Sequence, residues 1–148
     1  MTAVTVRSLA PWLLMAAAFT VADAGIPLYA RLGGEPGVAA ISTALIDRVA
    51  QDPRLGQSFK DTNLGRIKQK LAEQICELAG GPCRYSGDTM KQSHAGHHIG
   101  EAEFYGMVAD LRVILKERHV TEGATNELLR LLAPMKRDIV EPAPLFTK

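Results

Sequence analysis

Three of the four histidines of this chain lie close together, at His94, His97 and His98. A spacing of four residues would place His94 and His98 on one face of a helix, as two imidazole ligands of a metal ion require. Gly96 weakens a helix at this point, and the sequence has no H-E-x-x-H motif to complete a ligand set. We therefore disfavour a bare metal site and interpret His97 and His98 as solvated loop residues, which leaves His94 as the candidate for chemistry.

The two cysteines of the sequence, Cys76 and Cys83, are seven residues apart. In an oxidising compartment such a pair can close a small loop through a disulfide, whereas in a reducing compartment both stay thiols. The sequence leaves both states open.

Residues 1–24 have the pattern of a secretory signal peptide: a positive charge at Arg7, then an apolar stretch, then a small-x-small site that ends at Ala24. The alternative is an uncleaved membrane anchor, but the apolar stretch contains Pro11 and is shorter than the roughly 20 residues that span a bilayer. We expect cleavage after Ala24, no stable membrane span after cleavage, and an exported protein, periplasmic if the source is a Gram-negative bacterium.

Composition limits the class of the mature domain, residues 25–148. The chain is 47% hydrophobic and 22% charged, enough to form a packed core. A net charge of +1 argues against a nucleic-acid partner, and an aromatic content of 5% argues against a β-sandwich or barrel.

Apolar residues recur at helical spacing in four long segments, which predicts an all-α domain. The segments are 38–49, 64–78, 101–118 and a last one that runs to about Val140. Between the second and third lies an irregular stretch with room for a short helix at about 89–95, which would carry His94. We expect the tail from Glu141 to be loose.

Several short motifs follow one another between Leu28 and about Val140. They are Leu28-Tyr29-Ala30-Arg31-Leu32-Gly33-Gly34, Phe59 before Thr62-Asn63, Gly80-Gly81-Pro82, Tyr85-x-Gly87, Met90-Lys91-x-x-His94, and Phe104. Each motif is weak alone, but together and in this order they make the chain resemble the group I truncated haemoglobins.

The resemblance implies a truncated globin fold, in which a two-over-two helical sandwich surrounds a b-type haem. It also implies that His94 is the proximal ligand of the haem iron. Further residues would contact the haem: Phe59, Ile67, Lys70, Leu71, Met90, Ile99, Phe104 and Val108. No C-x-x-C-H motif is present, and Met135 stands where some relatives have a histidine bonded to the haem, so we expect no covalent attachment.

The gas-binding side departs from the family's pattern. Ile46 stands where the family usually has a tyrosine, and Ile67 and Leu71 stand where it often has a glutamine donor. A hydrogen bond to a charged acceptor contributes about 1.5–3 kcal/mol, so its loss should weaken dioxygen binding on the order of ten- to hundredfold. The binding of carbon monoxide and of nitric oxide depends less on such a donor.

Lys70 lies beside this apolar stripe, where some relatives place a side chain that binds the iron. It could be a sixth iron ligand after losing its proton, which burial next to haem favours. Alternatively it reaches outward to a haem propionate or to solvent, with Arg66 and Lys91 as competitors for the propionate.

The expected function is reversible binding of dioxygen, nitric oxide and carbon monoxide, as in oxygen carriers, by a monomer or weak dimer that an unidentified reductase keeps ferrous. One alternative is a haem redox enzyme, a nitric oxide dioxygenase or nitrite reductase, and detoxification of nitric oxide could also be a side activity. The other is a six-coordinate electron-transfer or sensor globin that uses Lys70 and the two cysteines.

Overall fold

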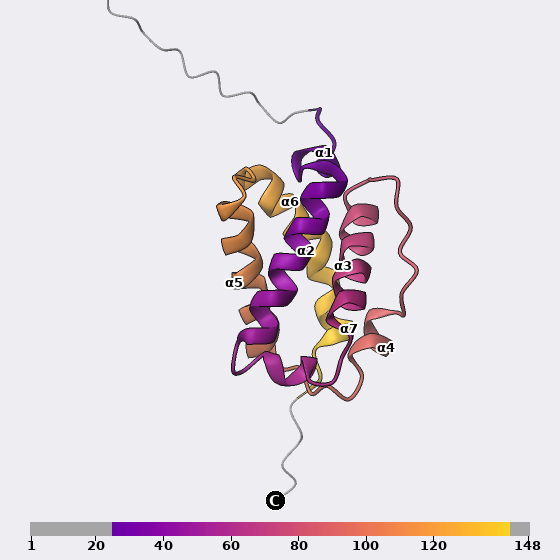
Figure 1. The fold of residues 1–148 in the computed structure, drawn as a ribbon, viewed down its shortest axis with the longest axis vertical. Helices are drawn as coiled ribbons and strands as arrows, with labels where there is room; N and C mark the ends of the chain where they lie inside the picture. The colour runs from indigo at the N-terminus through magenta and orange to yellow at the C-terminus, as the bar shows by residue number, and fades with distance from the viewer. Residues whose placement is uncertain (1–24, 143–148) are drawn as a thin grey trace, which may run out of the picture.

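The computed structural model describes residues 25–142, and in that part the chain forms helices joined by loops, with no strand (Figure 1). The expected all-α fold is confirmed. The leader expected at residues 1–24 lies outside the described residues. The elements are α1 (Leu28–Arg31), α2 (Gly34–Gln51), η1 (Gly56–Phe59), α3 (Leu64–Leu78), α4 (Met90–His94), α5 (Glu101–Glu117), α6 (Glu122–Leu132), η2 (Ala133–Met135) and α7 (Lys136–Ile139).

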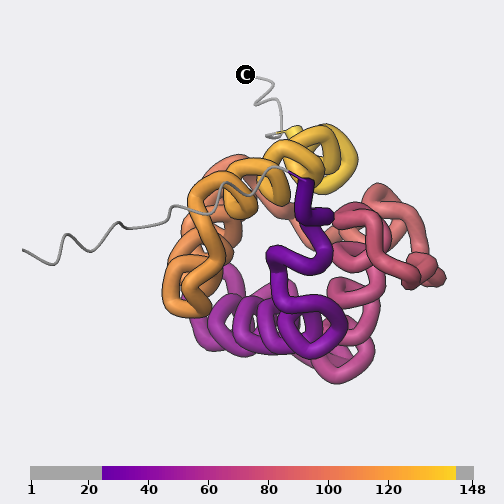
Figure 2. Tube along the Cα trace, turned by 90° about the horizontal axis from the view of Figure 1, so that it is seen from above, coloured from indigo at the N-terminus to yellow at the C-terminus, as the bar shows by residue number. Residues whose placement is uncertain are grey.

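The long helices form two pairs. Helix α2 packs on α3, α5 packs on α6, and contacts of α2 with α5 and of α3 with α6 join the pairs. Viewed along the long axis, α2 and α7 lie on opposite sides of the fold, with α3 and α4 on one flank and α5 and α6 on the other (Figure 2). The short helix α4 packs against α7, so the segment that carries His94 is supported by the end of the chain.

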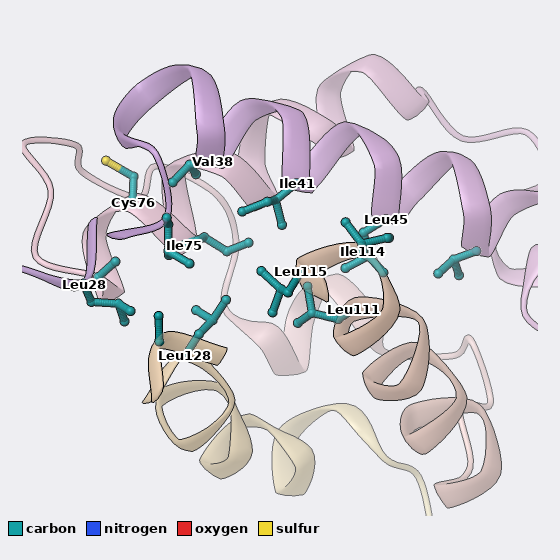
Figure 3. Packing of buried hydrophobic residues seen from close by; sticks show 14 of the residues in the cluster. Leu28, Val38, Ile41, Leu45, Ile75, Cys76, Leu111, Ile114, Leu115 and Leu128 are labelled. Atoms are coloured by element: carbon teal, nitrogen blue, oxygen red, sulfur yellow. The ribbon is translucent and has the colours of Figure 1, made fainter. Parts of the chain in front are cut away.

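The core lies where these helices meet (Figure 3). Ile41 and Leu45 of α2, Ile75 of α3, Leu115 of α5 and Leu128 of α6 are all at most 2% exposed. Burying side chains of this size contributes about 1.5–3 kcal/mol each. Packing of the apolar stripes of the four long helices thus stabilises the fold and positions the shorter elements.

Helix α3 has the predicted bounds because a capping residue begins it and a glycine ends it. The Asn63 side chain accepts a hydrogen bond from the backbone N–H of Arg66, 3.0 Å away, and so caps the first turn. At the other end Gly80 adopts φ +78°, a left-handed conformation that stops a helix.

Three expectations need correction. Helix α2 begins at Gly34, four residues before the predicted start at Val38. The last predicted helix is interrupted at Pro134, which lacks an N–H, and continues as η2 and α7. The tail is not loose at its first residue, because the N–H of Glu141 donates to the carbonyl of Ile99 at 2.8 Å.

None of the helices in residues 25–142 has the length and apolar character needed to cross a membrane.

Candidate functional site

His94 is the last residue of α4, a helix of little more than one turn. Thr89 and Gln92 hold the start of this helix with a reciprocal capping box: the Thr89 hydroxyl accepts from the Gln92 N–H, and the Gln92 side chain accepts from the Thr89 N–H, both at 3.2 Å. Such a short helix has little stability of its own, so the cap and the contact with α7 fix the position of His94.

The His94 ring is half-buried and has a defined tautomer. Its Nδ1 lies 2.8 Å from the carbonyl oxygen of Met90, one turn earlier. Because a carbonyl can only accept, Nδ1 carries the proton and Nε2 keeps a lone pair. Within residues 25–142 nothing hydrogen-bonds to Nε2.

Burial lowers the pKa of His94 below its ordinary value of 6.5, and the nearby His97 adds to this, although the hydrogen bond to Met90 acts in the opposite direction. The neutral imidazole is therefore favoured at neutral pH. A neutral ring with a fixed N–H and a free lone pair is the form of histidine that binds a metal ion.

The other two histidines of the cluster lie in the loop after α4 and are exposed. His98 Nδ1 lies 3.0 Å from Oε2 of Glu141, and the Gly96 N–H donates to Oε1 of the same carboxylate at 2.8 Å. No three His, Cys, Asp or Glu side chains in the described part of the chain converge on a site for a bare metal ion.

The residues expected to contact a haem come from η1, α3, α4, α5 and the loop before α5. All of them are half-buried: Phe59, Ile67, Lys70, Leu71, Met90, Ile99, Phe104 and Val108. Half-covered apolar side chains on several elements, together with one neutral imidazole, fit a large apolar cofactor with a metal at its centre. Ile46, on α2, is 1% exposed and offers no donor.

Lys70 extends from α3 to a carboxylate on its own helix. Its ammonium nitrogen lies 2.8 Å from Oε2 of Glu73 and 2.6 Å from the hydroxyl oxygen of Ser86. Glu73 also accepts from the N–H and the hydroxyl of Ser86, so the three residues form one network between α3 and the loop that leads to α4.

Gln74 also lies in this region, although it is not among the residues predicted from the sequence. It is 9% exposed, and its amide nitrogen lies 3.3 Å from the sulfur of Met90 and 3.6 Å from the sulfur of Met135. A signal for it existed, because Gln74 is a polar residue three positions after Leu71 on the otherwise apolar stripe of α3.

Cys76 and Cys83 are joined by a disulfide, with their Cα atoms 5.8 Å apart. The bond ties α3 to the start of the loop that leads to α4. Gly81 lies between them where a Cβ atom would come within 2.6 Å of the Cys76 sulfur and 2.7 Å of the Tyr29 ring, so the tight turn requires glycine.

Comparisons with known proteins agree with this geometry. Residues 27–141 match the model of the family described as bacterial-like globin. The group 1 truncated hemoglobin GlbN of Mycolicibacterium paratuberculosis is 31% identical over 112 residues, which cover 76% of this chain and 82% of that protein. The group 1 truncated hemoglobin of Tetrahymena pyriformis is 27% identical over 113 residues, 76% of this chain and 93% of that protein.

Solved structures give the same result. The crystal structure of the Tetrahymena pyriformis truncated hemoglobin in its Fe(III) form matches with a TM-score of 0.73 and 27% identity, and covers 78% of this chain and 98% of that one. Three findings lead to one assignment: the family model matches most of the chain, one relative is 31% identical, and the fold is shared. This chain belongs to the bacterial-like globin family and is a truncated globin.

Proposed function

We propose that this protein holds a b-type haem through His94 and binds dioxygen, nitric oxide and carbon monoxide reversibly at the haem iron. Membership of the globin family supports the haem and the class of ligand. The choice of His94 rests on the geometry of its ring. Nδ1 donates to the Met90 carbonyl at 2.8 Å, and Nε2 of this half-buried ring is left with a lone pair.

The chain's own residues have separate tasks in this proposal. The Met90 carbonyl orients the His94 ring and raises the electron density on Nε2. Apolar side chains from η1, α3 and α5, among them Phe59, Leu71 and Phe104, would cover the faces of the haem and exclude water. When bound, haem would supply the iron that binds the gas.

The side that receives the gas has no donor at the three positions where the family usually or often has one, namely Ile46, Ile67 and Leu71. We expect weak dioxygen binding relative to relatives with the usual donors, and a preference for carbon monoxide and nitric oxide. This argues for reversible binding ahead of dioxygen-dependent oxidation of nitric oxide.

Visible absorption spectra of the full-length protein loaded with haem test the proposal. Wild type should retain haem and change its ferrous spectrum when carbon monoxide is added. His94→Ala should lose haem or its proximal bond, whereas His97→Ala, at an exposed loop position, should behave as wild type. If His94→Ala has the wild-type spectrum and haem retention, His94 is not the ligand.

We also propose that the protein is exported, with residues 1–24 removed as a signal peptide. The pattern of those residues supports this, and so does the disulfide, since such bonds persist in oxidising compartments. Mass spectrometry of the mature N-terminus should find Gly25 as the first residue, and a chain that still begins at Met1 would refute the proposal.

A further inference from the structure

We propose that Gln74 is the hydrogen-bond donor of the gas-binding pocket and takes the place of the donors missing at Ile46, Ile67 and Leu71. The inference rests on the proposed function, because it concerns the same haem pocket. Gln74 would then help to determine which gas the haem prefers, although it lies outside those three positions.

The position of Gln74 on α3 supports this role. Residues three, four and seven apart share a helix face, so Gln74 lies on the face of Ile67 and Leu71, one turn closer to the end of the helix. The residues of α3 that are buried are Gln74, Ile75 and Cys76. Ile75 belongs to the main core and Cys76 to the disulfide, which leaves Gln74 without either role.

The present hydrogen-bond partners of Gln74 are weak. The amide nitrogen of Gln74 contacts two thioether sulfurs, at 3.3 Å and 3.6 Å. Thioether sulfur is a weak acceptor, and a buried amide without a good partner is destabilising. An apolar side chain at this position would avoid the destabilisation that a buried amide with weak partners brings. We therefore infer that the amide serves a stronger acceptor, one that arrives with the bound ligand.

Gln74 also contacts the helix that carries His94. Met90, whose sulfur contacts the amide, also provides the carbonyl that accepts from His94. Met135 in η2 provides the second sulfur. The amide of Gln74 therefore extends from α3 to α4, which carries His94, and to η2, in the region where we propose that the haem binds.

Dioxygen held at the proposed haem would carry partial negative charge, and Gln74 would find in it a stronger acceptor than a thioether. Rotation about the side-chain torsions of Gln74 would exchange the two sulfurs for the gas as hydrogen-bond acceptor. Carbon monoxide, which carries less charge, would gain less from this donor. Gln74 would thus restore part of the preference for dioxygen.

The test uses the full-length protein with haem and compares Gln74→Leu and Gln74→Met with wild type. The matched control is Gln69→Leu, because Gln69 is an exposed glutamine of the same helix that bonds to Glu73. In the ferrous carbon monoxide complex, both Gln74 variants should raise the C–O stretching frequency, and dioxygen should dissociate on the order of tenfold faster. Gln69→Leu should change neither quantity.

A second measurement needs wild type alone and applies even if the variants do not fold or lose haem: the C–O stretching band is compared in H₂O and D₂O. Ile46, Ile67 and Leu71 have no exchangeable side-chain proton, so a shift of the C–O band between H₂O and D₂O would indicate a donor such as Gln74. A wild type that binds haem and carbon monoxide but shows no such shift overturns the role of Gln74 and leaves the proposed function intact. A wild type that binds no haem overturns both.

Discussion

The ammonium nitrogen of Lys70 lies 2.8 Å from a carboxylate oxygen of Glu73, one turn further along α3. The hydrogen bond from Lys70 holds the pKa of Glu73 below its ordinary value, together with the hydrogen bonds from Ser86 and against the effect of burial. Glu73 is thus charged at neutral pH and attracts the ammonium group of Lys70. An amine must lose its proton to bind iron, so this ion pair opposes a role of Lys70 as sixth ligand.

We therefore predict that the ferrous haem protein has an open coordination site. Its visible spectrum should show one broad band that sharpens when carbon monoxide is added, and Lys70→Ala should leave this spectrum unchanged. Sharp, split bands before any gas is added, lost in Lys70→Ala, would show instead that Lys70 leaves Glu73 and binds the iron.

Replacement of Ile67 by glutamine should slow the dissociation of dioxygen. Ile67 is half-buried, and in the proposed haem pocket a glutamine here would add the donor that the family often has. A new donor to a partly charged acceptor should slow dissociation on the order of tenfold. Stopped-flow measurement checks this, with Ile67→Leu as a control that changes shape without adding a donor. Equal rates for the two variants would mean that position 67 does not face the gas.

Much of the fold could be predicted from the sequence because the signals are local. The bounds of α3 follow from the Asn63 cap, the apolar stripe and Gly80, all of which can be seen in the printed sequence. The break near Pro134 could also be inferred from proline chemistry. The apolar stripe across Leu132, Met135 and Ile139 concealed it, because helical periodicity survives a short 3₁₀ segment.

The candidate site could be predicted only in part. His94 followed from a family motif, but its hydrogen bond to Met90 and the role of Glu141 required coordinates. Glu141 binds the N–H of Gly96, 45 residues earlier in the chain, and periodicity carries no information about such a contact. The same holds for Gln74, whose two sulfur partners lie 16 and 61 residues away.

The disulfide should contribute to stability through the unfolded state. Its two cysteines are seven residues apart, and closing a loop of this size stabilises by about 2 to 3 kcal/mol in the chain-entropy treatment. Urea unfolding should therefore give a lower midpoint for Cys83→Ala than for wild type. Reductant should lower the midpoint of wild type and leave that of Cys83→Ala unchanged. A wild type whose midpoint ignores full reduction would contradict this.

Finally, the haem-free protein should lose stability as the pH falls below about 6.5, in part because of His94. Burial and the nearby His97 lower the pKa of this ring from its ordinary 6.5, so between the lowered value and 6.5 the unfolded chain binds more protons than the folded chain. The free energy of unfolding therefore rises with pH across this window and is constant above it, as far as His94 is concerned.

The quantity to compare is the difference between the unfolding curves of wild type and His94→Ala, because this difference isolates the contribution of His94. That difference should change with pH only below 6.5, and NMR titration should give His94 a midpoint under 6.5. A midpoint at or above 6.5 would mean that the hydrogen bond to Met90 outweighs burial, and the neutral ring required for iron binding would then need the iron itself to form.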